Sequence, residues 1–435
     1  MFPTLSRRTR GRYARASALG LLIVLLLDLF SLLSQYHTFK SNLHLNTIST
    51  RNDLPGAVRS DKIYIQAQFW TSALALYNGW SDTLLELVQV LGKEKVFVSI
   101  VESGSLDNTK EFLQYLDYKL GELGIERSVM LSDWSHADEL NRTNEAGVFH
   151  FPEYAGHNEN DGSRREWEVR RIPFLARERN RGLEPLVEMG KNGKRFDKIL
   201  VLNDVVFRPE DVLSLLGTRE GRYSAACALD FHYANEGYYD TFALRDSEGR
   251  KSVQRTFPYF RSGDSRAAML KGMPGRAKSC WNGMVVMDAA PFYSGIGEAE
   301  PGLRYRGIED SLAELHVEGS ECCLIWADME ASGDTEAGIW VNPAVRVGYV
   351  QKAYEDTHFG VSKDFLTGLV YVKGIWINRF IRWIGSGMKQ PRAVKNRVAQ
   401  WKKEGNSIGE ERKEVGEMCL IDEMHVLIWN GWKHL

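Results

Sequence analysis

The stretch KVFVSIVESGSLDNTKEFLQYLDYKLGELG, residues 95–124, changes its periodicity halfway along. It begins with an apolar run typical of a buried strand, passes through a polar turn and continues with leucines at helical spacing. The residues before it repeat this order, with an alternating run at 61–70 and a helical pattern at 72–92 that stops at Gly92. This order of strand and helix predicts an α/β fold, a mostly parallel sheet with helices on both faces.

The later part of the chain continues the pattern less regularly. Residues 167–190 predict a helix with a break near Pro173, and residues 132–166 predict a long loop. The buried strand KILVLNDVVF (198–207) leads into a helix that starts at RPED, where Pro209 and the acids suit a first turn. We expect further strands at YSAACALDF (223–231), SCWNGMVVMDA (279–289) and ECCLIWADM (321–329), and a charged, peripheral segment at 396–416.

The N-terminus carries arginines and no acid before an apolar run that Asp28 interrupts. We expect a cytoplasmic tail at 1–16, an uncleaved signal-anchor helix at 17–35 and a stem at 36–59, with everything after Tyr36 in the lumen. A cleaved signal peptide is the alternative, but no suitable pair of small residues follows the run. The expected domains after the stem are a catalytic domain at 60–355 and a C-terminal extension, packed on it or peripheral to it, at 356–435.

The charge and the cysteine content of the chain indicate which kinds of partner and which compartment to expect. The net charge of −2 gives no reason to expect nucleic acid as a partner. All five cysteines follow the anchor, so one or two disulfides can form in a lumenal compartment and at least one thiol stays unpaired. No CxxC spacing points to zinc. Asn141 begins the only acceptor sequon for N-glycosylation, Asn-Arg-Thr.

The strand at 198–207 ends in two polar residues, Asn203 and Asp204. Ligands of open α/β sheets bind outside the carboxyl ends of the strands, so we expect Asp204 at that edge. Nucleotide-sugar transferases with the GT-A fold carry an Asp-x-Asp motif here, whose carboxylates hold a divalent metal that binds the diphosphate. This chain has Leu202-Asn203-Asp204 instead, so only the second acid is present. A capping or turn role for Asp204 is the alternative.

Two other stretches suit the donor side of such a site. Glu102, Ser103, Ser105 and Asp107 follow a strand and are placed to hydrogen-bond a nucleobase or ribose, although Asp107 or Asn108 could simply cap the next helix. Arginines alternate with apolar positions at 177–181, as on a half-exposed helix. They are either a solvated face or useful charge beside a diphosphate.

Two further stretches suit an acceptor. Asn-Gly enters the strand at 279–289, and Glu309 and Asp310 begin a helix, where a carboxylate could orient or deprotonate a sugar hydroxyl. These two acids could equally complement the helix dipole. The stretch 229–249 is rich in Asp, Tyr and His and suits a sugar-contacting loop, unless it is merely solvated.

Together these stretches resemble fungal glycosyltransferase family 69, which includes the cryptococcal capsule-associated α-1,3-mannosyltransferases. The resemblance covers roughly residues 60–350 and keeps one order. The matching stretches include VSIVESGSLDNTKEFL, RIPFLARERNRGLEPL, FDKILVLNDVVFRPEDVLSLL, KSCWNGMVVMDAAPF and VNPAVRVGYV. It implies a GT-A-like, Rossmann-type mixed sheet flanked by helices, in a type II membrane protein of the Golgi. It also implies transfer of mannose from GDP-mannose, in α-1,3 linkage, to a mannose-containing glycan with the help of a divalent cation, expected to be manganese.

The resemblance also implies roles for single residues. Asp204 would bind the metal, with His358 a candidate further ligand because other GT-A enzymes recruit a late histidine. Glu102, Ser103, Ser105 and Asp107 would lie along the nucleotide, with Arg179 and Asn180 nearby. The acceptor side would be lined by Trp281, Asn282, Glu309 and Asp310.

If donor and product are both α, configuration is retained. Retention can come from same-face attack, which we prefer, or from a covalent intermediate on a carboxylate such as Asp240 or Asp246. Two other functions stay open: a transferase of the same fold that uses UDP-xylose or UDP-glucose, and an inactive scaffold in polysaccharide assembly. The natural acceptor, whether capsule polysaccharide, glycolipid or protein O-glycan, also stays open.

Overall fold

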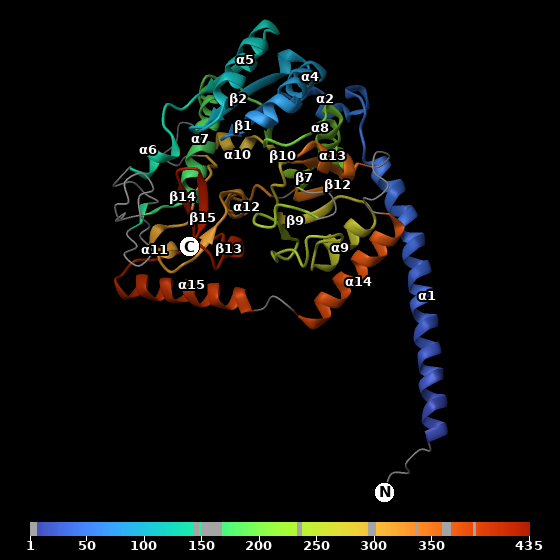
Figure 1. The fold of residues 1–435 in the computed structure, drawn as a ribbon. Coiled ribbons are helices and arrows are strands. Elements are labelled where there is room, and N and C mark those ends of the chain that lie inside the picture. The colour runs from blue at the N-terminus through green and yellow to red at the C-terminus, as the bar shows by residue number, and fades with distance from the viewer. Residues whose placement is uncertain are drawn as a thin grey trace.

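The structure, a computed structural model, describes residues 7–141, 148–149, 168–232, 237–294, 302–335, 337–358, 367–385 and 389–435. One nine-stranded sheet forms its centre (Figure 1). Its strands are β1 (Ile63–Phe69), β2 (Val96–Glu102), β3 (Glu126–Met130), β6 (Lys198–Leu202), β7 (Ala225–Phe231), β8 (Arg245–Asp246), β9 (Gly275–Ser279), β10 (Met284–Asp288) and β12 (Ile339–Gly348).

The strand order is β3-β2-β1-β6-β10-β7-β12-β9-β8. The first four strands are parallel to one another, as the repeated strand–helix pattern predicts. β10 is antiparallel to both of its neighbours, β6 and β7, whereas β12 is parallel to β7. The sheet is therefore mixed and flanked by helices, which confirms the predicted GT-A-like α/β class.

Helices cover both faces of this sheet (Figure 1). Residues alternate between the faces along each strand, so Ile63 and Ile65 of β1 join one apolar cluster and Tyr64 joins the other. The first cluster contains α4 (Ser81–Leu91), α5 (Thr109–Glu122) and α8 (Pro209–Leu216). The second contains α7 (Arg171–Lys191), α12 (Glu321–Ala331) and residues of α14 (Gly368–Ile384) and α15 (Lys389–Ser407).

Smaller elements complete the fold. The short helices are α2 (Gly56–Ser60), α3 (Ala73–Ala75), α6 (His136–Leu140), α9 (Gly263–Leu270), α10 (Ala290–Tyr293), α11 (Asp310–Ala313) and α13 (Gln351–Thr357). The short strand pairs are β4 (Val148–Phe149) with β5 (Glu168–Val169), β11 (Glu318–Gly319) with β13 (Leu420–Ile421), and β14 (His425–Ile428) with β15 (Gly431–His434).

The structure corrects the expectation of a strand at 321–329, which forms the helix α12. Ser320 caps it, because its Oγ accepts a hydrogen bond from the backbone N–H of Cys322 (3.2 Å). The helix is buried nearly all round, so its sequence lacks the polar stripe that normally marks a helix. A continuous apolar run of this length cannot be told from a buried strand by its periodicity.

Two smaller expectations also change. The predicted break near Pro173 is absent from α7, because Pro173 lies in the first turn, where a missing backbone N–H costs nothing. Part of the expected loop at 132–166 is the helix α6, capped by Ser135. The helix expected at 72–92 is present but changes direction at Gly79, whose φ is 114°.

The two chain ends pack differently. The helix α1 (Arg7–Leu45) contains a segment long and apolar enough to cross a membrane, Arg15–Leu45. It also continues past residue 35 into the expected stem, where Phe39 and Leu43 are buried against the body. At the other end, α15 packs on α11 and β13, and the hairpin β14–β15 contacts α6 and α7.

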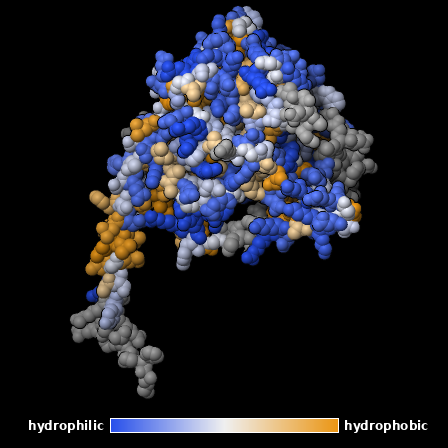
Figure 2. All heavy atoms as spheres, turned by 180° about the vertical axis from the view of Figure 1, so that it is seen from behind, coloured by the Kyte–Doolittle hydropathy of each residue, from blue (hydrophilic) through white to orange (hydrophobic). Residues whose placement is uncertain are grey.

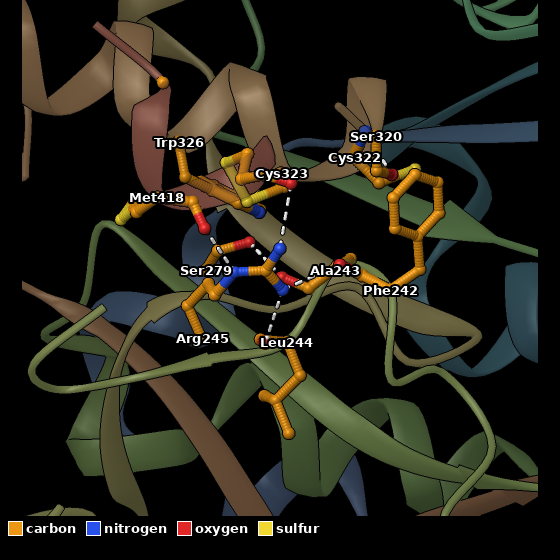
Figure 3. The surroundings of a disulfide bond; sticks show 12 residues. Phe242, Ala243, Leu244, Arg245, Ser279, Ser320, Cys322, Cys323, Trp326 and Met418 are labelled. Carbon is orange, nitrogen blue, oxygen red and sulfur yellow. Dashed lines mark hydrogen bonds between the residues drawn. A yellow bond between two sulfur atoms is a disulfide. The ribbon is translucent and has the colours of Figure 1, made fainter. Parts of the chain in front are cut away.

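Two disulfides join parts of the chain that are distant in sequence. Cys227 of β7 pairs with Cys280, and Cys323 of α12 pairs with Cys419, while Cys322 is a buried free thiol. Below the second disulfide, the buried Arg245 side chain donates to the carbonyl oxygen of Cys419 (2.9 Å) and to that of Phe242 (2.8 Å) (Figure 3). The loop around Phe242 is thus fixed to the C-terminal segment.

Candidate active site

Asn203 and Asp204 directly follow the last residue of β6, where the chain leaves the sheet. One Asp204 oxygen, Oδ2, accepts a hydrogen bond from the Ser72 hydroxyl (3.0 Å). Burial raises the pKa of the Asp204 carboxyl above its ordinary value, and the Ser72 hydrogen bond opposes this only in part. No lysine, arginine or histidine of the described residues forms an ion pair with Asp204. Burial of the Asp204 carboxyl is thus not offset by an ion pair within the described part of the chain.

Asp204 faces a cavity of about 400 Å³, a size that suits a small-molecule ligand. The cavity lies where β1, β6 and β12 end and just beyond β7, so it occupies the carboxyl edge of these mutually parallel strands. Its polar lining comes from four separate segments: Thr71, Ser72, Asp204, Arg208, His232, Tyr349 and Tyr354. The sequence predicted Asp204 at this edge, and the structure places it there.

Asn203 connects this edge to the neighbouring strands. Its Oδ1 accepts a hydrogen bond from Trp281 Nε1 (3.3 Å), and its Nδ2 donates to the Tyr349 hydroxyl (3.4 Å). The Tyr349 hydroxyl in turn donates to Asp230 Oδ2 (3.3 Å). The residue at the middle of the incomplete motif therefore sets the positions of two aromatic side chains rather than facing the cavity itself.

A pair of buried acids, Asp230 and Asp240, follows Tyr349 in this network. Asp230 Oδ1 accepts a hydrogen bond from the backbone N–H of Asp240 (3.0 Å). Burial and the charge of Asp240 raise the pKa of Asp230 to about 8, and burial also raises the pKa of Asp240. Asp240 accepts further hydrogen bonds from the backbone N–H groups of Ala243 (3.0 Å) and Asn282 (3.3 Å). Burial and the mutual repulsion of the two carboxylates thus favour retention of a proton in this pair.

Trp281 and Asn282, predicted on the acceptor side, lie beside this pair and are buried. Asn282 has a φ of 63°, and its Oδ1 accepts a hydrogen bond from the Tyr238 hydroxyl (2.7 Å). The backbone is left-handed at Asn282 and Gly283, so these residues form a turn before β10, whereas the sequence analysis expected the strand to run from residue 279. Cys280 comes directly before Trp281, so its disulfide to β7 anchors this turn.

Arg179, predicted near the nucleotide, lies against Trp281 instead of in the Asp204 cavity. Its guanidinium stacks over the Trp281 ring, 4.5 Å from the centroid, and its Nε pairs with Glu321 Oε1 (3.0 Å). Asn180 exchanges two hydrogen bonds with the backbone of Tyr305, donating to the carbonyl (2.8 Å) and accepting from the N–H (2.9 Å). These contacts fix α7 against the segment before α11.

The four polar residues after β2 support the cavity wall and are not among its lining residues. Ser105 Oγ accepts from the N–H of Thr71 (2.9 Å), and Asp107 Oδ2 accepts from the N–H of Ala73 (3.0 Å). Ser103 bonds the carbonyl oxygen of Phe69 through its own N–H (3.0 Å), and the buried Glu102 accepts from the N–H groups of Ser105 and Ser132. Together they hold the segment that contains Ser72, the partner of Asp204.

The remaining predicted residues lie away from the cavity lining. His358 Nδ1 is 2.7 Å from the carbonyl oxygen of Tyr354, and its Nε2 is 3.4 Å from Asp211 Oδ1. Asp246 accepts hydrogen bonds from the N–H groups of Ser262 (2.7 Å) and Arg250 (3.0 Å).

Glu309 and Asp310 begin α11, where Asp310 pairs with the buried Arg170 (2.9 Å). Asn141 is exposed at the end of α6, and the rest of its sequon lies outside the described residues.

The sequence analysis did not name Asp230 or His232, although both lie at the start of the stretch 229–249 that it expected to contact sugar. They stand at the end of β7 and directly after it, so the polar end of an apolar strand was a further signal. Tyr239 and Tyr349 pack on the His232 ring, with centroids 5.2 and 6.0 Å away. His232 thus brings an imidazole to the cavity that holds the Asp204 carboxylate.

The described residues contain one other group with metal-ligand chemistry, Glu423, His425 and His434 on the C-terminal hairpin. Glu423 Oε2 lies 3.2 Å from His425 Nε2 and 3.1 Å from His434 Nδ1. The guanidinium of Arg171 stacks over Trp432 beside them, 4.4 Å from the ring centroid. Burial and this positive charge contribute to lowering the pKa of His425 to about 4. Contacts of the Glu423 carboxylate with the two imidazole rings explain why these three side chains lie together.

Comparison with known proteins identifies the family. The sequence model of a family described as cryptococcal mannosyltransferase 1 matches residues 62–328, which is more than half of the chain. The matched region contains β1, β6, Asp204, Asp230, His232 and Trp281. No curated protein matches the sequence.

Several solved structures are similar to this chain at low identity and with low TM-scores. S. aureus TarS 1–349 is 10% identical, with 80% of this chain and 72% of that chain covered and a TM-score of 0.34. The mannosyltransferase PcManGT from Pyrobaculum calidifontis, in complex with GDP-Man and Mn²⁺, is 8% identical, covers 88% and 87%, and has a TM-score of 0.32. GalNAc-T7 with UDP, GalNAc and Mn²⁺ is 12% identical, covers 80% and 55%, and has a TM-score of 0.34. Likenesses this weak say nothing about the substrate.

Proposed function

The chain belongs to the cryptococcal mannosyltransferase family and is a glycosyltransferase, and we propose that it transfers mannose from GDP-mannose to a mannose-containing glycan. We propose α-1,3 linkage and retention of configuration. The observation that carries this proposal is the Asp204 carboxylate, which forms no ion pair with the described residues and faces a cavity of about 400 Å³ at the carboxyl edge of the sheet. A nucleotide sugar needs such a place, with a group for its diphosphate at the strand ends.

The residues of this cavity fit a divalent cation. Asp204 offers a carboxylate oxygen in a desolvated position, and His232 offers an imidazole on the same cavity. Carboxylate oxygens suit manganese and magnesium, and an imidazole is also accepted by manganese-class ions. When bound, such an ion would neutralise charge on the diphosphate as it leaves. We propose manganese, held by Asp204 and His232, with the predicted ligand His358 as the competing assignment.

Measurements of Mn²⁺ binding distinguish between His232 and His358 as the metal ligand. The unmodified chain, His232→Ala and His358→Ala would each be titrated with Mn²⁺ in the presence of GDP, and free Mn²⁺ would be measured by electron paramagnetic resonance. We expect His232→Ala to weaken binding at least about 10-fold, since a metal ligand is lost, and His358→Ala to leave it unchanged. The opposite result would restore His358 as the ligand.

Other side chains have defined tasks in the proposed reaction. Arg208 lines the cavity and supplies a positive charge for the diphosphate. Trp281 is held between Asn203 and Arg179, so its face is fixed for the sugar side of the site. We propose same-face attack rather than a covalent intermediate, because Asp240 and Asp246 already accept several backbone hydrogen bonds. Protein N–H groups make these carboxylates weaker nucleophiles.

The other sequence-based assignments carry over as proposals. On the nucleotide side we propose Glu102, Ser103, Ser105 and Asp107, acting through the segment they support, with Arg179 and Asn180 nearer to the sugar. On the acceptor side we propose Asn282, Glu309 and Asp310. We also propose a type II protein of the Golgi membrane, supported by the apolar helix α1 and the arginines before it. In the lumen Asn141 would be available for glycosylation.

A comparison of nucleotide-sugar donors tests the proposed function directly. The purified chain would be incubated with Mn²⁺, a short α-mannoside and labelled GDP-mannose, UDP-xylose or UDP-glucose in parallel. We expect mannosylated product from GDP-mannose alone, with an α-1,3 bond by nuclear magnetic resonance. Transfer from a UDP-sugar alone would contradict the proposed donor. Absence of transfer and of donor hydrolysis with all three would support a non-catalytic scaffold instead.

A further inference from the structure

The helix α14 presents an apolar outer face next to the candidate membrane anchor (Figure 1). Its inner face, with Tyr371, Val372 and Ile375, is buried in the body. The outer face consists of Leu369, Val370, Trp376, Phe380, Trp383 and Ile384, and Trp383 is 81% exposed. Positions 369, 373, 376, 380 and 383 share one side of a helix, so the apolar side chains from Trp376 onwards form one stripe, which the exposed Lys373 separates from Leu369 and Val370.

Contacts with α1 fix the depth of this stripe. Near the start of α14, the Tyr371 ring packs on the rings of Tyr36 (5.5 Å) and Phe39 (5.4 Å). Two turns later, Trp376 Nε1 donates to Asp28 Oδ2 (2.7 Å), and Arg379 pairs with the same oxygen (2.6 Å). The two helices therefore run antiparallel, and α14 moves along α1 from the level of residue 36 to that of residue 28. Trp383 lies still further along.

That level is inside the apolar part of α1. The side chains at 19, 21–27 and 30 are large, apolar and exposed, and orange atoms cover this part of the helix in Figure 2. From Leu32 onwards, α1 begins to bury side chains against the body. A bilayer that surrounds residues 19–30 of α1 must also reach the second half of α14, because Trp376 and Arg379 contact α1 at Asp28.

The charged residues on this side of the molecule support the same placement of α14 at the membrane. An acid in the middle of an apolar span is costly in lipid unless it is paired, and Asp28 is paired with Arg379. Arg379, Arg382 and Arg266 lie near one another on this side of the molecule. Tryptophan, phenylalanine and arginine in this arrangement are typical of helices at the membrane interface.

We propose that α14 is a second membrane-contacting element, whose C-terminal half enters the acyl-chain boundary of the lumenal leaflet beside α1. The partner is the lipid bilayer itself, because the stripe continues the surface of the candidate spanning helix. This inference rests on the proposal that α1 spans a membrane. It explains why Asp28 interrupts the apolar run: its carboxylate holds Trp376 and Arg379 of α14.

Spin labels test the depth of α14. Single cysteines at Trp383 and Phe380 would be labelled in the chain reconstituted into phosphatidylcholine vesicles. Leu25→Cys on α1 and Tyr118→Cys on the exposed face of α5 would serve as the lipid and water references. Relaxation by oxygen, which concentrates in lipid, would be compared with relaxation by a water-soluble nickel chelate.

We expect the labels at 380 and 383 to match Leu25→Cys, with strong relaxation by oxygen and weak relaxation by nickel. If they match Tyr118→Cys while Leu25→Cys stays in lipid, α14 lies in water and the inference is wrong. Weak relaxation by both reagents would mean a protein contact and would also overturn it. If Leu25→Cys itself is in water, the proposed anchor fails as well.

The ion pair provides a second test. Asp28→Asn leaves Arg379 without its partner at membrane depth, so we expect the label at 383 to become at least about 3-fold more accessible to nickel. Arg379→Gln combined with Asp28→Asn removes both charges and should restore the protected state. Equal accessibility in the unmodified chain, the single variant and the double variant would contradict the role of the pair.

Discussion

At the amino end of the parallel strands, Asp61 interacts with Lys198, the first residue of β6, and with Asp197 and Asp288. At the carboxyl end of the same strand, Asp204 has a serine hydroxyl as its partner and forms no ion pair with the described residues. Burial raises the carboxyl pKa at both ends, to about 6 for Asp61. The Asp204 end also has a cavity of about 400 Å³ in front of the acid.

The difference shows how one sheet separates stability from function. At the amino end, Lys198 supplies the positive charge from within the protein, and Asp197 accepts a hydrogen bond from the N–H of Lys62 (2.7 Å). At the carboxyl end, Asp204 forms no ion pair with the described residues, and a ligand that brings its own cation can supply the compensating charge. Four variants or conditions test this comparison.

The largest effect is expected at Asp204. Asp204→Asn keeps the shape of the side chain and the bond to Ser72 but removes the charge. We expect kcat/KM for mannose transfer to fall at least about 100-fold, since stabilisation of the leaving diphosphate is worth several kcal/mol. Asp61→Asn is the matched control at the other end and should leave kcat/KM unchanged. Full activity of Asp204→Asn with unaltered dependence on Mn²⁺ would refute the assignment.

A smaller loss is expected at Asn203. Asn203→Ala removes the bonds to Trp281 and Tyr349 but leaves Asp204 in place. We expect kcat/KM to fall about 10-fold through poorer alignment of the sugar, with Mn²⁺ binding unchanged. Steady-state kinetics and Mn²⁺ titration distinguish the two effects. Unchanged kinetics would mean that the network around Asn203 serves the fold alone.

The pH dependence of activity is the third test. Asp204 must be ionised to hold a cation, and its raised pKa places loss of activity at a less acidic pH than for an ordinary aspartate. Activity is therefore expected to fall as pH decreases, and more Mn²⁺ should shift this fall to lower pH, because the ion competes with the proton. If the fall in activity at low pH does not depend on the Mn²⁺ concentration, it is caused by a group other than Asp204.

The smallest effect is expected at Asp61. Its folded-state pKa is about 6 against an ordinary value of 3.8, so the folded chain binds more protons between these values and loses stability as pH rises through them. Asp61→Asn removes this loss and should stabilise the chain at neutral pH by up to about 1 kcal/mol, because the carboxylate is half-buried and solvent screens it. The gain should disappear below pH 3.8 in urea unfolding. Destabilisation at neutral pH would contradict this.

The sequence was sufficient for features that depend on neighbours in the chain. The strands at 63–69, 96–102 and 198–202 and the position of Asp204 at a strand end follow from local apolar patterns and polar ends. The helix α12 could not be predicted, because complete burial removes the amphipathic pattern. His232 could not be placed beside Asp204, because that needs the strand order β6-β10-β7, which no local pattern contains.

The same limit explains why the contact of Arg179 was not predicted. Its spacing on a helix was correct, but its partner Trp281 is about a hundred residues away in the chain and meets it only through packing of α7 on the sheet.

The most direct test of the account is Mn²⁺ binding in the presence of GDP, measured by electron paramagnetic resonance for the unmodified chain, Asp204→Asn and Asp61→Asn. The account predicts one tightly bound Mn²⁺ per chain that Asp204→Asn loses and Asp61→Asn keeps. Equal binding by all three, or loss in Asp61→Asn alone, would contradict the claim that the carboxyl edge of the sheet is the cation-binding end.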